Sequence, residues 1–304
     1  MAHAPRMNVR CRQWGNKTVL YTFSVVTVLV IVWLVSNICN EYSWIPCVNT
    51  CERNITKSVY GLTCDHHFKD CTIIHTVIRQ RNEASSKANE LQKKIGQMQC
   101  QSLQKSNGSH TSQTGGWCHN SGKHFADENL AEALSELFKG KRVASFGDGP
   151  GKYKQLLENS GKGITYDAFD GAPFCEETSQ GNVKFLDLTL SQYGLPFYDW
   201  VISLEVAEHI PREFESVYIN NINRHAREGV VLSWAVPGQD GYAHINNHPF
   251  DYVVQIMREN GLHHDPEKSE VLKKAAKLNW LQNNVNVYMR RKCSQSDSEM
   301  HLLP

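Results

Sequence analysis

The 304-residue sequence lacks an excess of charge of either sign, because 32 lysine and arginine residues nearly balance 31 aspartate and glutamate residues. A nucleic-acid-binding protein needs a positive surface to contact phosphates, and no long basic run supplies one here. We therefore predict no nucleic-acid partner and expect a small or neutral ligand.

Charged residues are absent from Thr18–Asn40, whose centre is almost wholly apolar. About 20 apolar residues span a bilayer as a helix. Basic residues precede the segment without acids, while the charges after it nearly cancel, so the positive-inside rule places the N-terminus in the cytosol. We expect a cytoplasmic tail (1–17), a transmembrane helix (18–40) and a lumenal remainder. We therefore predict a single-pass type II membrane protein, in the Golgi or another secretory-pathway membrane. A cleaved signal peptide is the less favoured alternative, because the segment is long and lacks a convincing cleavage site.

Residues 41–120 have the composition of a lumenal stem. In an oxidising lumen their six cysteines predict disulfides, although the sequence does not give the pairing. N-glycosylation sequons at Asn54 and Asn107 fall on the same side of the membrane. The spacing of Cys64, Cys71 and the histidines near them matches no strong zinc pattern, so we favour disulfides over a metal there. The cysteines of the stem are Cys47, Cys51, Cys64, Cys71, Cys100 and Cys118.

The end of the stem is polar and compatible with a helix over residues 79–105. Leu91, Ile95 and Met98 form an apolar stripe at helical spacing. The stripe fits either a solvated helix or a weak self-association seam, in which Cys100 would bridge two chains of a homodimer. Residues 106–116 are rich in Ser, Gly, Asn and Thr and are typical of a linker. We place the catalytic domain at 121–293 and a flexible tail at 294–304.

Short apolar runs alternate with helical patterns in the catalytic domain, which predicts a parallel α/β sheet. Two further runs near the C-terminus suggest a hairpin-like pair of strands with a long loop between them. The expected strands are 142–146, 163–169, 183–186, 200–204 and 229–234, followed by the pair at 261–264 and 284–289.

A glycine-rich turn follows the first expected strand. Gly147, Gly149 and Gly151 alternate with other residues, so the backbone can bend sharply and approach a ligand. Asp170 ends the second strand, where an acid can accept hydrogen bonds from a ribose diol. A glycine turn alone also fits an ordinary tight turn, and the fold alone does not choose the cofactor.

Three segments resemble motifs of class I S-adenosylmethionine-dependent methyltransferases. Residues 143–151 resemble the cofactor motif, 185–188 the third motif, and 199–211 the fourth motif with its following turn. The resemblance covers residues 124–292 and is closest to the membrane-anchored or secreted methyltransferase-like proteins of animals. It implies a Rossmann-like, seven-stranded methyltransferase sheet and S-adenosylmethionine as cofactor.

The resemblance also implies roles for individual residues. Ser145 departs from the family, which usually has an acid there to help hold the methionine moiety, and the sequence does not fix the direction of the nearby Asp148 side chain. The three glycines would approach the cofactor through their backbone. The side chains implied near the cofactor are Asp170 at the ribose, Asp187 at the adenine amine, Leu188 packing beside it, and Glu205 at the end of the fourth strand.

Methyl transfer needs an aligned acceptor and can need a base. His209 is the leading candidate base, since histidine titrates near neutrality, although a structural role in the turn, hydrogen-bonded to backbone, is slightly favoured over catalysis. Glu208 and His244 are alternatives. Residues 233–248 have the composition of an acceptor-binding lid. The lid residues suited to a sugar are Trp234, Gln239, His244 and Asn246. We predict no metal site.

The sequence thus predicts O-methylation of a glycan or another polyhydroxylated acceptor in the secretory pathway. A catalytically inactive lumenal binding or scaffold protein on the same fold is the main alternative, and Ser145 favours it. A cytosol-facing enzyme acting on lipids or proteins would require the inverted topology.

Overall fold

The computed structural model describes residues 68–103, 111–118 and 124–291. The predicted cytoplasmic tail, the transmembrane segment 18–40, both sequons and the C-terminal tail 294–304 lie outside these ranges. Among the described helices, none combines the length and the apolar character needed to cross a bilayer.

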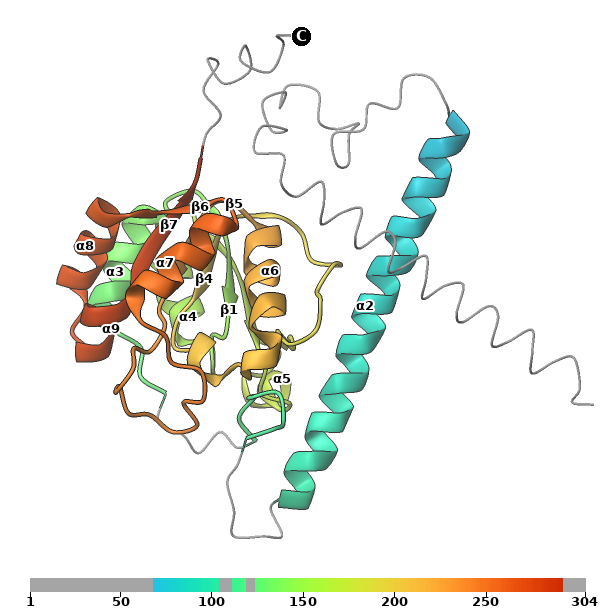
Figure 1. The fold of residues 1–304 in the computed structure, drawn as a ribbon, viewed down its shortest axis with the longest axis horizontal. Coiled ribbons are helices and arrows are strands. Elements are labelled where there is room, and N and C mark those ends of the chain that lie inside the picture. The colour runs from blue at the N-terminus through green and yellow to red at the C-terminus, as the bar shows by residue number, and fades with distance from the viewer. Residues whose placement is uncertain (1–67, 104–110, 119–123, 292–304) are drawn as a thin grey trace, which may run out of the picture. The chain divides into compact units, whose positions relative to one another are not determined.

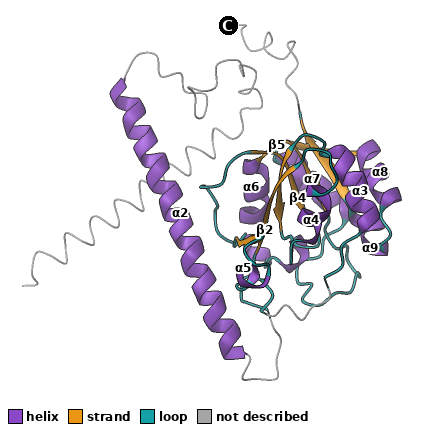
Figure 2. Ribbon diagram, turned by 180° about the vertical axis from the view of Figure 1, so that it is seen from behind, coloured by secondary structure: helices purple, strands orange, loops and turns teal. Residues whose placement is uncertain are grey.

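A seven-stranded sheet forms the centre of the described unit (Figures 1 and 2). The strand order is β3-β2-β1-β4-β5-β7-β6. Strands β1 to β5 are mutually parallel, and β7 runs antiparallel to both of its neighbours, β5 and β6. This order and these directions confirm the Rossmann-like, seven-stranded methyltransferase sheet. The strands are β1 (Arg142–Phe146), β2 (Thr165–Asp170), β3 (Val183–Phe185), β4 (Tyr198–Ser203), β5 (Ala226–Leu232), β6 (Leu262–Asp265) and β7 (Asn286–Arg290).

Helices cover both faces of the sheet, as Figure 2 shows from behind. The α-helices are α2 (Phe68–Leu103), α3 (Glu128–Leu137), α4 (Lys152–Glu158), α5 (Cys175–Thr178), α6 (Glu215–His225), α7 (Phe250–Glu259), α8 (Pro266–Ala275) and α9 (Asn279–Asn284). Two short 3₁₀ turns, η1 (Ala207–His209) and η2 (Arg212–Phe214), follow β4. The last two strands pair as predicted, but helices α8 and α9 connect them in place of the expected long loop.

Two apolar layers hold the helices on the sheet. Ala144 and Phe146 face one layer together with residues of α6 and α7, whereas Val143 faces the other layer with residues of α3, α4 and α8. This alternation follows from the two-residue period of a strand. Because both faces of the central strands are covered, they consist of nearly continuous apolar runs, which made them recognisable in the sequence.

Helix α2 and the sheet belong to one compact unit, whose bounds are Cys64–Lys292. Nδ2 of Asn89 donates to the carbonyl of Phe185 at 3.0 Å, and Oδ1 of Asn89 accepts from the amide of Asp187 at 2.9 Å. Lys93 also forms an ion pair with Glu176 at 2.6 Å. These contacts cover β3, an edge strand of the sheet. Part of the segment expected to be a separate stem therefore packs against the domain.

Residues 111–118 form an ordered turn, where the sequence predicted a linker as far as residue 116. Thr111 and Trp117 form an antiparallel bridge, and a disulfide joins Cys118 to Cys100 at the end of α2. The predicted bridge between two chains through Cys100 is therefore wrong, because this cysteine is bonded within its own chain. The apolar stripe of Leu91, Ile95 and Met98 is exposed on α2.

Candidate functional site

The turn between β1 and α4 has a backbone that requires glycine. The φ angles are +103° at Gly147 and +57° at Gly149, a left-handed region that other residues rarely adopt. A Cβ atom at Gly147 would lie 2.1 Å from Cγ2 of Val206, and one at Gly149 would lie 2.9 Å from Nδ1 of His124. Both glycines line a cleft, whereas Gly151 precedes α4 and does not line it.

Asp170 ends β2 beside this turn. Its Oδ2 accepts a hydrogen bond from the amide of Gly149 at 2.8 Å, and its Oδ1 accepts from the amide of Ala172 at 2.8 Å. Burial raises the pKa of the carboxyl, while these two bonds oppose the rise. A carboxylate offers about four lone-pair sites, so acceptor capacity remains for the hydroxyls of a ligand.

Asp187 follows β3 and has one oxygen without a partner. Its Oδ1 accepts from the amide and the hydroxyl of Thr189 at 2.8 and 2.6 Å. Its Oδ2 is buried and accepts no hydrogen bond from the described residues. An unsatisfied buried acceptor costs about 1–3 kcal/mol, so a ligand amine that donated to it would stabilise the complex. Leu188 lines the same part of the cleft.

Ser145 lies near the end of β1, and Asp148 lies within the glycine turn. Both are buried and both line the cleft. Asp148 accepts hydrogen bonds from the hydroxyl of Tyr166 at 3.1 Å and the amide of Lys154 at 3.3 Å. Burial raises the pKa of Asp148 to about 6. The structure thus answers a question that the sequence left open, because the Asp148 carboxyl points inward.

The cleft has a cavity volume of about 530 Å³, within the range of small-molecule sites. It lies at the carboxyl ends of β1, β2 and β4. The strand order reverses between β1 and β4, and ligands of open α/β sheets bind at such a switch point. The predicted residues that line the cleft are Gly147, Gly149, Asp170, Asp187, Leu188, Glu205, His209 and His244.

Sequence reasoning missed one wall of the cleft. Residues 114–117 line it, although they fall in the predicted stem. A Cβ atom at Gly116 would lie 2.0 Å from the carbonyl oxygen of Gly171, so this segment packs closely on the turn after β2. The adjacent pair Gly115-Gly116 before Trp117 was the available signal, but a Ser- and Gly-rich context favours a linker. Other lining residues that were missed include His124, Tyr153 and Trp280.

Glu205, which follows β4, adopts an unusual backbone conformation, with φ at +56°. Its amide donates to Oγ of Ser233 at 2.7 Å, and its Oε1 accepts from that hydroxyl at 2.8 Å and from Nδ2 of Asn284 at 3.3 Å. A non-glycine residue in this region costs of order 1–3 kcal/mol, and such strain often marks functional sites. The bonds to Ser233 and Asn284 fix the carboxylate at the edge of the cleft.

Glu208, His209 and His244 come together at one end of the cleft. Nδ1 of His209 lies 3.1 Å from the carbonyl oxygen of Ala243, and Nδ1 of His244 lies 3.3 Å from that of Gln239. Since a carbonyl only accepts, each Nδ1 carries the proton, and each Nε2 is left as an acceptor. Nε2 of His244 lies 3.9 Å from Oε1 of Glu208. Burial lowers the pKa of His209 to about 4, which makes it a weaker base than expected.

The Glu208 side chain is fully buried, and neither carboxylate oxygen accepts a hydrogen bond from the described residues. Burial, with the nearby charge of Glu205, raises the pKa of Glu208. Glu208 does not line the cleft, but its backbone carbonyl accepts from the amides of Ile245 and Asn246 at 2.9 and 3.0 Å. These bonds fix the predicted lid against η1.

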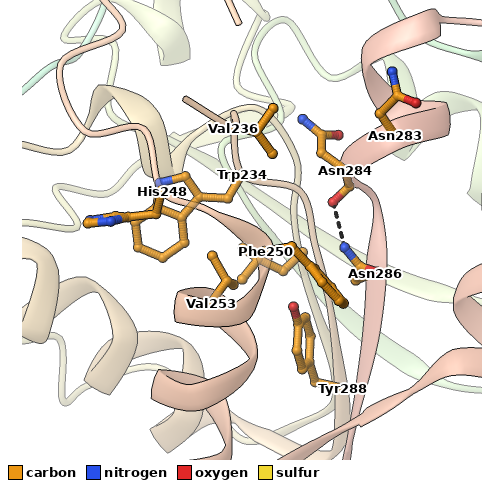
Figure 3. A pocket seen from close by; sticks show the side chains of 10 residues that line it. Trp234, Val236, His248, Phe250, Val253, Asn283, Asn284, Asn286 and Tyr288 are labelled. Atoms are coloured by element: carbon orange, nitrogen blue, oxygen red, sulfur yellow. Dashed lines mark hydrogen bonds between the residues drawn. The ribbon is translucent and has the colours of Figure 1, made fainter. Parts of the chain in front are cut away.

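The predicted lid divides into two parts. Gln239 and His244 line the cleft, but Trp234 and Asn246 are buried away from it. Nε1 of Trp234 donates to the carbonyl of Asn246 at 2.6 Å. Trp234 lines a separate cavity of only about 20 Å³, shown in Figure 3 with His248 and Phe250. This small cavity has room for little more than one water molecule, so the assignment of Trp234 and Asn246 to acceptor binding is not supported.

No family model matches the sequence, and no curated protein matches it. The fold is similar to that of solved methyltransferases. One is magnesium protoporphyrin IX methyltransferase from Synechocystis with bound S-adenosylhomocysteine, at 17% identity and a TM-score of 0.41, over 57% of this chain and 91% of that one. Another is a TehB-like S-adenosylmethionine-dependent methyltransferase from Corynebacterium glutamicum, at 14% identity and a TM-score of 0.39, over 54% and 88%.

A third is 1,6-didemethyltoxoflavin-N1-methyltransferase from Burkholderia thailandensis with bound S-adenosylhomocysteine, at 14% identity and a TM-score of 0.39, over 54% of this chain and 79% of that one. All three scores lie below 0.5, so the likeness gives no information on the acceptor of this chain.

Proposed function

We propose that the chain is an S-adenosylmethionine-dependent methyltransferase. The cleft at the switch point of the sheet carries this proposal, because it brings together the three features that an adenosine ligand needs. The glycine turn admits the methionine tail past the backbone, Asp170 faces the turn with acceptor capacity for a ribose, and Oδ2 of Asp187 is a buried acceptor without a donor. An adenine amine supplies such a donor.

When bound, this cofactor supplies a methyl group on a sulfonium sulfur, which an acceptor displaces in line. The chain contributes position and charge. Asp170 and Asp187 would hold the nucleoside, and Glu205, His209 and His244 line the end of the cleft where an acceptor would bind. Alignment of the two reacting groups can supply several kcal/mol of the barrier reduction, so binding geometry accounts for much of the catalysis.

The acceptor that we propose is a hydroxyl of a glycan or another polyhydroxylated molecule. Trp117 and Tyr242 lie in the wall of the cleft with their ring centroids 5.2 Å apart, and Gln239 and His244 are adjacent polar groups. Aromatic faces beside hydrogen-bonding groups suit the apolar faces and the hydroxyls of a sugar ring. The proposed location is a secretory-pathway membrane. The apolar segment 18–40 supports it, as does the Cys100–Cys118 disulfide, because such bonds persist in oxidising compartments.

The alternative of an inactive binding protein has one specific observation in its favour. Ser145 lines the cleft without a charge where methyltransferases usually carry an acid. Asp148 argues against an inactive protein, because its carboxyl lies in the same wall of the cleft as Ser145. Binding of the cofactor without turnover on any hydroxylated acceptor would favour the binding protein.

Calorimetry of the full chain with S-adenosylmethionine and S-adenosylhomocysteine tests the proposal. We expect one molecule bound per chain, and we expect Asp170→Asn to weaken binding roughly 10- to 100-fold, since hydrogen bonds to charged groups contribute about 1.5–3 kcal/mol. Asp251→Asn, on the exposed side of α7, is the matched control and should bind like the wild type. No heat and no thermal shift with either ligand at millimolar concentration would overturn the assignment.

A further inference from the structure

We propose that Glu208, His209 and His244 bind a divalent first-row transition-metal ion at the acceptor end of the cleft. Each of these side chains offers one ligand atom, and the three atoms lie within 4.8 Å of one another. Two imidazoles and one carboxylate form a donor set that binds Zn²⁺, Mn²⁺, Fe²⁺ or Co²⁺ in preference to Mg²⁺ or Ca²⁺, which favour oxygen ligands. The inference rests on the proposed function, because it concerns the activation of the acceptor.

The first argument is the orientation of the histidines. Both donate Nδ1–H to a backbone carbonyl, His209 to Ala243 and His244 to Gln239. A metal-binding histidine nearly always donates its second ring nitrogen in this way, which fixes the tautomer and leaves Nε2 for the ion. Both histidines of this cluster therefore have the orientation expected of metal ligands.

The second argument is the unsatisfied carboxylate of Glu208. It is fully buried, and neither of its oxygens has a partner in hydrogen-bonding geometry among the described residues, since the backbone amides of Glu208 and Ala235 interact with it only outside that geometry. The group nearest to it in the cluster, Nε2 of His244, is an acceptor at 3.9 Å. Carboxylate oxygens buried without a donor are unfavourable, because they have lost their water. A cation between Glu208, His209 and His244 would compensate the buried carboxylate and would also bind the two imidazole nitrogens.

The dimensions fit a site that closes on its ion. A tetrahedral ion with bonds of about 2.1 Å places its ligand atoms about 3.4 Å apart. The present separations are therefore wider by up to about 1.4 Å, which side-chain rotations can close. Three protein ligands also leave a position for an exogenous group, as in catalytic zinc sites. His209 and His244 line the cleft, so this position would face the acceptor.

The ion would act on the hydroxyl of the acceptor. A hydroxyl oxygen bound to a divalent ion loses its proton to water more readily, since the metal lowers its pKa. That oxygen then forms the new O–CH₃ bond as the CH₃–S bond of the cofactor breaks, and S-adenosylhomocysteine leaves. No separate general base is needed, because the proton leaves to water.

Sequence reasoning predicted no metal site because the set is split. Glu208 and His209 are adjacent, but His244 is distant in the sequence and belongs to the loop after β5. Only the contact between this loop and η1, through the Glu208 carbonyl, brings the third ligand to the first two.

Titration of the metal-free full chain with Co²⁺ tests the site. We expect one equivalent to give visible d–d absorption and a dissociation constant in the micromolar range or below. Glu208→Gln, which preserves shape, and His244→Ala should each weaken Co²⁺ binding at least 10-fold. His263→Ala, on β6, is the matched control and should bind as the wild type. The inference would be overturned if the wild type bound no tight equivalent of Co²⁺, or if both cluster variants bound Co²⁺ with the affinity of the wild type.

Parallel calorimetry with S-adenosylhomocysteine separates this inference from the proposed function. Glu208→Gln should retain the nucleoside within about threefold of the wild-type affinity, which also shows that the variant is folded. If the nucleoside binds and Co²⁺ does not, the metal site is refuted and the methyltransferase proposal stands. If Co²⁺ binds and the nucleoside does not, the methyltransferase proposal fails, and the role of the ion in methyl transfer fails with it.

Discussion

At the scale of single residues, the carboxyl groups of the cleft differ in how well they are satisfied. Asp170 has two backbone donors, Asp187 has one unsatisfied oxygen, and Glu208 has no donor at all. Buried polar atoms without partners are few in native proteins, so those of Asp187 and Glu208, in and beside one cleft, call for a ligand that would pair with them. Such atoms lower the stability of the free protein, and ligands that pair with them restore it.

Asp148 should make stability depend on pH. Its pKa in the folded state is about 6, against an ordinary value of 3.8. Between about pH 4 and 6 the folded state therefore holds a proton that the unfolded state has released, so the free energy of unfolding falls as pH rises through this window and levels off above it. This difference in pKa between the folded and the unfolded state corresponds to about 3 kcal/mol.

Urea denaturation of wild type and Asp148→Asn at several pH values measures this effect. The amide keeps an acceptor for the hydroxyl of Tyr166 but carries no charge, so its curve should be flatter between pH 4 and 6. Asp170 and Glu205 also have raised pKa values, and the difference between the two proteins removes their contribution. Parallel curves would contradict the assignment of the pH dependence to Asp148.

At the scale of elements, α2 protects the edge of the sheet and positions part of the site. Asn89 bonds the backbone on either side of Leu186, next to Asp187. We expect Asn89→Ala to lower the free energy of unfolding by about 1–3 kcal/mol, because it leaves two buried backbone groups unpaired. Nucleoside affinity should fall by several-fold through displacement of Asp187. Glu90→Ala, at the neighbouring exposed position of α2, should change neither quantity, and an equal effect of both variants would argue against the specific contact.

The strands were predictable and much of the site wall was not, for physical reasons. Strands of a doubly covered sheet need continuous apolar runs, so β1, β4 and β5 were evident, with ends displaced by a few residues. Helix α8 begins with a side-chain cap at Asp265 and a proline, but it carries few apolar residues and gives a weak periodic signal. Asp170 ends β2 and Asp187 follows β3, so their place at the carboxyl edge was fixed by topology. Residues 114–117 depend on tertiary packing that no local pattern encodes.

At the scale of the whole molecule, the Cys100–Cys118 disulfide ties the end of α2 to the segment that forms a wall of the cleft. Closing a loop of this size contributes about 3 kcal/mol in the chain-entropy model. We expect the double variant Cys100→Ser with Cys118→Ser to lose about 2–4 kcal/mol of stability and to bind S-adenosylhomocysteine less tightly, because residues 114–117 lose their anchor.

Chemical denaturation and calorimetry of this double variant test the point, with wild type in dithiothreitol for comparison. Reduction of the wild type should reproduce the affinity of the double variant, and reduction of the double variant should have no further effect on affinity. Unchanged affinity in both cases would show that the segment holds its place without the bond.

The covering of β3 by α2 determines where the molecule can be cut. A fragment that starts at residue 121 would lack Asn89. It would therefore expose the edge strand β3, because the carbonyl of Phe185 and the amide of Asp187 would lose their hydrogen-bond partner. Bare strand edges recruit other chains, so such a fragment would be prone to aggregate. The cleft of such a fragment would also be open on one side, because Gly116 and Trp117, which line it, would be missing. Loss of ligand binding by that fragment would then report the truncation and not the affinity of the intact site.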